Sequence, residues 1–127
     1  MTGARLSRRA LLGHGAALWA LPVFAETTPR LLSIGGSVTE IVHALDQGHR
    51  LVARDTTSTY PPEVTDLPDV GYARALSPEG VLSVDPSHIL AIEDAGPPET
   101  IQVLEASGIP VTSVPDASDG PGILQKI

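Results

Sequence analysis

The sequence predicts an α/β fold in which helices flank a parallel sheet. After residue 30, short apolar runs alternate with amphipathic stretches, and this alternation is typical of repeated strand–helix–strand units. Helix-start signals, a serine or proline followed closely by an acid, stand between the apolar runs. The 127 residues, 42% hydrophobic and 18% charged, have the composition of one ordinary globular domain.

The strands are expected in five apolar runs, and the helices lie between them. The expected strands are 30–36, 50–54, 69–71, 87–92 and 109–115. The expected helices are 38–46, 78–84, 97–107 and a last one in 118–127. The polar stretch 55–68 carries three prolines and neither periodicity, so we expect a loop there.

Two helix starts carry capping signals. Ser37 and Glu40 have the spacing of a capping box before the first helix. Ser77, Pro78 and Glu79 give the next helix an N-cap, a proline at the first position and an acid in the first turn. The last helix ends after about two turns, too short to be stable alone in water. We therefore expect a truncated sequence that lacks a C-terminal half.

The first 25 residues have the layout of a secretory signal peptide. Three arginines precede any acid, an apolar stretch covers 10–24, and small residues lead to cleavage after Ala25. Glycines and Pro22 interrupt the stretch, which is shorter than the ~18 clean apolar residues of a membrane anchor. The run "SRRALLG" at 7–13 resembles the twin-arginine export signal. We expect export to the periplasm.

Charge and cysteine content restrict the partners of the mature chain. Cleavage removes three of eight basic residues and none of fifteen acidic ones, which leaves a formal charge of −10. Nucleic acid binding is excluded, because phosphates need a basic surface. Without cysteine there is no disulfide, thiolate metal site or lipid-modified N-terminus. We expect a soluble monomer that does not insert into a membrane.

Tyr72 and Arg74 are the candidate site residues. Tyr60 and Tyr72 are the only aromatic residues outside the predicted signal peptide, and Tyr72 follows a predicted strand, where open α/β folds bind ligands. In an extended backbone Tyr72 and Arg74 project to the same side. A guanidinium favours the phenolate form of a neighbouring phenol, and tyrosine is a known ligand of haem iron. Arg74 could equally pair with a ligand carboxylate. Composition alone is also compatible with two ordinary surface residues.

Other residue groups point to no second site. The sequence "GGS" at 35–37 lacks the glycine pattern of a nucleotide site and is expected to form a tight turn. Glu93 and Asp94 are adjacent, and adjacent residues in a strand point to opposite faces, so they are expected to be two solvated charges rather than an acid–base pair. No histidine pair has metal-ligand spacing, and we expect structural or surface roles for His43, His49 and His88.

Four segments together resemble a known family. They are "GGSVTEI", "DTTSTYP", "LPDVGYARALSPEGVLSVDPSHILA" and "EDAGPP", in the order and spacing of that family. Residues 30–127 resemble the N-terminal lobe of the periplasmic haem-binding proteins of bacterial haem ABC importers. These proteins are related to the siderophore and vitamin B12 binding proteins.

The resemblance implies a fold and a role for each candidate residue. Two α/β lobes joined by a long helix enclose the ligand, so residues 26–127 would be the N-terminal lobe, truncated where the connecting helix starts and lacking the C-terminal lobe. Tyr72 matches the tyrosine that ligates haem iron, Arg74 an arginine beside the haem, and Glu79 the acid that docks on the permease of the transporter.

The resemblance implies a binding protein that captures haem, its transported ligand, and delivers it to an ABC transporter for iron uptake, and not an enzyme. The alternatives are a ferric siderophore or cobalamin binding protein of the same fold, a Rossmann-like enzyme lobe, and a fragment without function.

Overall fold

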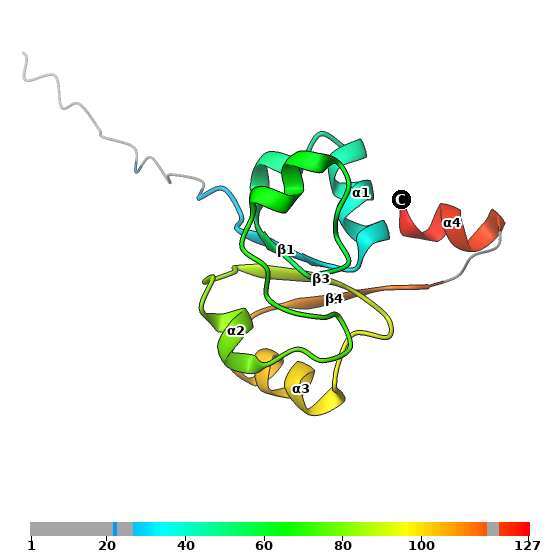
Figure 1. The fold of residues 1–127 in the computed structure, drawn as a ribbon. Helices are drawn as coiled ribbons and strands as arrows, with labels where there is room; N and C mark the ends of the chain where they lie inside the picture. The colour runs from blue at the N-terminus through cyan, green and yellow to red at the C-terminus, as the bar shows by residue number, and fades with distance from the viewer. Residues whose placement is uncertain (1–21, 23–26, 117–119) are drawn as a thin grey trace, which may run out of the picture.

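A parallel sheet of four strands is the centre of the fold (Figure 1). The computed structural model describes residues 22, 27–116 and 120–127. The strands are β1 (Leu31–Ile34), β2 (Leu51–Arg54), β3 (His88–Ile92) and β4 (Val111–Val114), in the spatial order β2-β1-β3-β4. All three pairings are parallel, so the expected α/β fold class is confirmed.

Helices cover both faces of the sheet. They are α1 (Gly36–Ala44), α2 (Pro78–Leu82), α3 (Pro98–Ala106) and α4 (Gly120–Lys126), with 3-10 helices η1 (Gly48–Arg50) and η2 (Pro62–Asp66). Figure 1 shows α1 on one side of the sheet and the pair α2 and α3 on the other. Because the strands are parallel, each connection has to return from the carboxyl end of one strand to the amino end of the next.

The core divides into two clusters because side chains alternate across the sheet. Leu32 and Ile34 of β1 pack with residues of α2 and α3, and Leu31 packs with α1 and η2. All four residues of β1 are buried, as expected for a central parallel strand with both faces covered. Burying a large aliphatic side chain such as Leu32 stabilises the fold by about 1.5–3 kcal/mol.

Two segments differ from the expected secondary structure. The predicted strand 69–71 is wrong, since Asp69 forms only an isolated bridge with Arg54 and Gly71 leaves the extended region at φ 105°. The predicted loop 55–68 contains η2, which begins at consecutive prolines and buries Val64 beneath the sheet face covered by α1. The hydrogen bond from the Gly71 N–H to the side chain of Asp69 and the positive φ of Gly71 form a turn where a strand was predicted.

The start of α1 also differs from the expectation. The capping box is wrong, because Gly35 is the N-cap and no side chain caps the helix, while Ser37 lies exposed within it. Gly35 adopts φ 105°, and a side chain there would collide with Ile92. The start of α2 is confirmed, since the hydroxyl of Ser77 accepts the Gly80 N–H at 3.1 Å, although α2 ends at Leu82.

The termini are described only in part. The predicted signal peptide, residues 1–25, lies outside the described residues apart from Pro22. The predicted last helix is confirmed over Gly120–Lys126, where Lys126 forms an ion pair with Asp116 at 3.4 Å. In the part of the chain that is described, no helix has the length and apolar character needed to cross a membrane.

Asp55, immediately after β2, is a fully buried carboxylate whose oxygens are saturated by hydrogen bonds. Its Oδ1 accepts the Gly35 N–H at 2.8 Å and the Ser58 hydroxyl at 2.6 Å. Its Oδ2 accepts the backbone N–H and the hydroxyl of Thr57 at 3.0 and 2.6 Å. Asp55 therefore fixes the turn between β1 and α1 to the loop that follows β2.

A chain of buried hydroxyls continues from Asp55 beneath α1. The hydroxyl of Ser58 lies 2.6 Å from that of Thr39, which lies 2.6 Å from that of Ser33. All three residues are fully buried. Because buried polar groups are costly without partners, this connected set fixes the position of α1 on the sheet.

Replacing Asp55 by alanine is expected to destabilise the protein strongly. Asp55→Ala leaves four donors without their acceptor, at about 1–3 kcal/mol for each group that water cannot reach. The exposed Asp66 is the control, and Asp66→Ala should change the free energy of unfolding by less than about 0.5 kcal/mol. Urea denaturation measures both, and equal losses would contradict a structural role for Asp55.

Two glycines with positive φ allow strain to be separated from collision. Gly35 and Gly108 have φ 105° and 89°, but only at Gly35 would a Cβ atom meet a neighbour, Ile92. Gly108→Ala should cost about 1 kcal/mol. Gly35→Ala should cost about 1–3 kcal/mol more, because the core must shift. Thermal and urea unfolding of the two variants give the difference, and a similar cost for both would refute the collision.

Candidate functional site

The carboxyl ends of the strands meet at one edge of the sheet, and the segment 69–76 lies along that edge. The Thr56 N–H, just after β2, donates to the Gly71 carbonyl at 3.0 Å. The Leu76 N–H donates to the Gly96 carbonyl, after β3, at 3.0 Å. In open α/β sheets this edge is where ligands bind. The structure therefore brings the segment that carries Tyr72 and Arg74 to the expected place.

Asp69 fixes the turn that presents Tyr72. Its Oδ1 accepts the Gly71 N–H at 2.8 Å and the Thr56 hydroxyl at 3.0 Å, and its Oδ2 lies 3.3 Å from Nη1 of Arg54. The Arg54 side chain is only 12% exposed and also donates to backbone carbonyls of η2. Asp69 was not among the residues predicted from the sequence, although an aspartate two residues before a glycine is a turn signal.

Tyr72 is an exposed ring on this fixed segment. Its side chain is 49% exposed, whereas the neighbouring Ala73 is buried in the core. The assumption of an extended backbone is wrong, because the Ala75 N–H donates to the Tyr72 carbonyl at 2.8 Å and closes a turn. Among the described residues no side-chain hydrogen bond engages the Tyr72 hydroxyl, so the phenol oxygen is available to a ligand.

Arg74 binds a carboxylate of the protein. Its Nη2 donates to Oδ2 of Asp94 at 3.0 Å, and both side chains are about half exposed. The guanidinium is therefore engaged by Asp94 rather than by the phenol of Tyr72. Arg74 and Asp94 line a surface depression of about 550 Å³, together with Glu93, Ala95, Gly96, Pro97 and Pro98.

Asp94 differs in role from its neighbour Glu93. Two solvated charges were expected from the sequence, but Asp94 is the ion-pair partner of Arg74. Glu93 points elsewhere, since its Oε2 accepts the Asp116 N–H at 3.5 Å, beyond β4. No signal in the sequence connects Asp94 with Arg74, because the contact joins loops twenty residues apart in the chain.

Glu79 is an exposed acid in the segment that follows Tyr72 and Arg74. It lies in the first turn of α2, and α2 begins close to Leu76, which is bonded to the loop after β3. In the described part of the chain its carboxylate makes no side-chain hydrogen bond or ion pair. An acid in a first helical turn also complements the helix dipole. Glu79 is thus free to meet a partner surface.

The histidines do not form a metal site with acidic side chains in the described ranges. His88 bonds through Nε2 to the Thr112 hydroxyl at 2.8 Å, between β3 and β4. The ring of His43 packs over Gly48, where any side chain would collide with it. Tyr72 therefore remains the metal-ligand candidate.

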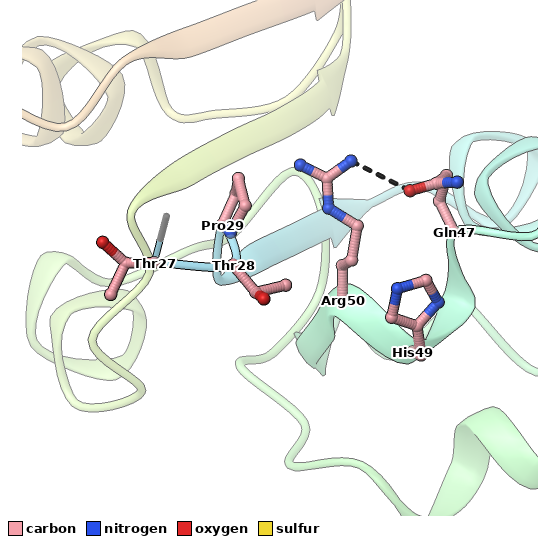
Figure 2. Close-up of a pocket in the computed structure, with 6 residues that line it drawn as sticks. All are labelled: Thr27, Thr28, Pro29, Gln47, His49 and Arg50. Atoms are coloured by element: carbon pink, nitrogen blue, oxygen red, sulfur yellow. Dashed lines mark hydrogen bonds between the residues drawn. The ribbon is translucent and has the colours of Figure 1, made fainter. Parts of the chain in front are cut away.

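A second depression lies at the opposite edge of the sheet (Figure 2). It measures about 570 Å³ and is lined by residues that precede β1 and β2: Thr27, Thr28, Pro29, Gln47, His49 and Arg50. Arg50 is occupied by Gln47, whose Oε1 accepts its Nη1 at 2.9 Å. Although slightly larger, this depression lies at the amino ends of the strands, so the edge with Tyr72 is the better candidate.

Solved structures resemble this lobe closely. The chain is 43% identical to the periplasmic haem-binding protein RhuT from Roseiflexus sp. RS-1, covering 71% of this chain and 35% of that chain with a TM-score of 0.69. It is 38% identical to a periplasmic haem-binding protein from Pseudomonas aeruginosa, covering 77% of this chain and 35% of that one with a TM-score of 0.75.

A curated relative names a different ligand. The vitamin B12-binding protein of Yersinia pestis (strain Pestoides F) is 33% identical over 87 residues, which are 68% of this chain and 31% of the relative. The chain spans about a third of the length of the proteins it matches. The match corresponds to the N-terminal part of two-lobed periplasmic binding proteins.

A family model gives the assignment. The model described as periplasmic binding protein matches residues 31–127, which cover all the described strands and helices. Members of this family are binding proteins and not enzymes, in agreement with the expectation from the sequence. The parallel sheet and this match agree, and the chain belongs to the periplasmic binding protein family.

Proposed function

We propose that this chain captures haem in the periplasm and delivers it to the permease of an ABC transporter for iron uptake. The observation that carries the proposal is the exposed phenol of Tyr72 on a fixed turn at the carboxyl edge of the sheet. The two relatives of 43% and 38% identity that are named as haem-binding proteins support haem as the ligand.

The proposed mechanism begins with the phenolate oxygen of Tyr72. A phenolate is a hard donor suited to ferric iron, and tyrosine serves as a haem ligand in other proteins. The hydrogen bonds of Asp69 hold the turn in advance, which lowers the entropy lost when the ligand is bound. Arg74 offers its guanidinium to the carboxylates of the haem propionates.

Delivery and location complete the proposal. Glu79 is exposed near the site, where it can pair with a basic residue of the permease. Residues 1–25 act as a signal peptide of the twin-arginine type, and residues 26–127 form the N-terminal lobe. The mature chain works as a monomer in the periplasm.

Cobalamin is the second candidate ligand. The 33% identity to a vitamin B12-binding protein supports it, and the fold serves both ligands. Cobalamin coordinates its cobalt through its own corrin ring and nucleotide base, with a small exogenous group on the remaining side, and it presents amide side chains, so it would need neither a phenolate nor a guanidinium. Titration of the protein with cyanocobalamin distinguishes cobalamin from haem as the ligand. Titration with a ferric siderophore tests the remaining alternative, a siderophore-binding protein.

Removing one hydroxyl tests the haem ligand. Tyr72→Phe keeps the ring but removes the donor, and we expect haem affinity to fall at least about tenfold, since even outer-shell partners of a metal ligand are worth ~10–100-fold. The phenolate-to-iron charge-transfer absorbance should also disappear. Tyr60→Phe is the matched control, because Tyr60 is likewise exposed, at 63%. An unchanged spectrum in Tyr72→Phe, or the same loss in Tyr60→Phe, would refute the assignment.

Glu79 is tested by separating binding from delivery. Glu79→Ala should leave haem affinity unchanged and raise the protein concentration needed for half-maximal uptake about tenfold, through loss of a charge pair with the permease. Proteoliposomes that contain the transporter measure uptake. Glu105→Ala is the control, because it removes an equally exposed acid from the last turn of α3. Normal uptake with Glu79→Ala would show that Glu79 is no docking residue.

A further inference from the structure

The ion pair of Arg74 with Asp94 joins two loops whose backbones are already fixed to each other. The Gly96 N–H donates to the Ala73 carbonyl at 2.9 Å, and the Leu76 N–H donates to the Gly96 carbonyl at 3.0 Å. Arg74 lies between Ala73 and Leu76, the two residues of its own loop that make these bonds, and Asp94 lies two residues before Gly96. The pair is therefore a built feature of the site rather than a chance meeting of two mobile side chains.

The pair is open to exchange with a ligand. The side chains of Arg74 and Asp94 are 56% and 57% exposed, and the contact is a single one, from Nη2 to Oδ2 at 3.0 Å. Exposed ion pairs contribute little free energy, because water screens them. A guanidinium binds carboxylates best through two parallel N–H groups, so an incoming carboxylate can offer Arg74 a better geometry than Asp94 does.

We propose that Asp94 is a specificity-determining residue that competes with the carboxylates of the ligand for Arg74. This inference rests on the proposed function, in which Arg74 receives a ligand carboxylate. While the site is empty, Asp94 occupies the guanidinium. A ligand with carboxylates displaces Asp94 from Arg74. A ligand without carboxylates leaves the ion pair intact, so Arg74 still neutralises the charge of Asp94.

The proposal predicts a selective effect of one charge. Asp94→Asn removes the competing charge and keeps the shape, so affinity for haem should rise about two- to fivefold, which is the size of an exposed ion pair. Affinity for the dimethyl ester of haem, whose propionates carry no charge, should stay the same. In an Arg74→Ala background the gain should vanish, because no guanidinium is left to compete for.

Glu93→Gln supplies the matched control. Glu93 lies next to Asp94, lines the same depression and has the same charge, but its carboxylate accepts the Asp116 N–H instead of a guanidinium proton. If the gain came only from weaker repulsion of a negative ligand, Glu93→Gln would raise haem affinity as much as Asp94→Asn. The proposal expects little change in Glu93→Gln.

The experiment is an absorbance and fluorescence titration of the full chain and its variants with haem and its dimethyl ester. The proposal is supported if Asp94→Asn raises the affinity for haem and three controls show no such gain. The controls are Glu93→Gln with haem, Asp94→Asn with the dimethyl ester, and Asp94→Asn in the Arg74→Ala background with haem. Equal affinities of Asp94→Asn and the unaltered chain, or equal gains in both acid variants, overturn it.

The proposed function fails separately. If the unaltered chain binds no haem, or binds it with a spectrum that does not depend on Tyr72, the haem proposal is wrong. If haem binds through Tyr72 and Asp94→Asn has no effect, only the role of Asp94 is wrong. Thermal unfolding of each variant verifies folding, and since Asp94 is exposed we expect little change.

Discussion

The buried carboxylate of Asp55 is the constraint on which the rest of the lobe depends. A fully buried carboxyl group is tolerated only where hydrogen-bond partners surround it, and Asp55 accepts four hydrogen bonds. These bonds join the turn before α1 to the loop after β2, and the hydroxyls of Ser58, Thr39 and Ser33 extend the connection beneath α1. The carboxyl edge of the sheet is thereby fixed before any ligand arrives.

The candidate site contains a similar arrangement of an aspartate and a glycine, in the segment between β2 and β3. Asp69 receives the Gly71 N–H and holds Arg54, as Asp55 receives the Gly35 N–H, and both glycines have φ 105°. In both places an aspartate accepts the N–H of a glycine with positive φ, from twenty residues away at Gly35 and from within the same turn at Gly71. One turn starts a helix that covers the core, and the other presents Tyr72 to solvent.

Much of this fold could be predicted from the sequence, because it depends on local patterns. The buried run of β1 and the cap at Ser77 are visible in short windows of sequence, and the structure confirms both. The failures have physical causes. The predicted capping box at Ser37 does not form, because Gly35 is the N-cap and its N–H is bonded to Asp55, twenty positions away. The predicted strand at 69–71 does not form, because the side chain of Asp69 accepts the Gly71 N–H and closes a turn. The position of Tyr72 at a sheet edge was predicted from a strand at 69–71 that does not form, and the partner of Arg74 was not predicted, since it depends on loops that meet only in the fold.

The backbone bonds between Gly96 and the segment 73–76 have a mechanical consequence. Two loops that share two such bonds move together, so the backbones that carry Tyr72 and Asp94 keep a nearly constant separation, while the two exposed side chains can still rotate. In the proposed function, these two loops therefore keep one backbone shape whether the site is empty or filled. Release of the ligand would then come not from a movement of these loops but from side chains, such as the return of Asp94 to the guanidinium of Arg74.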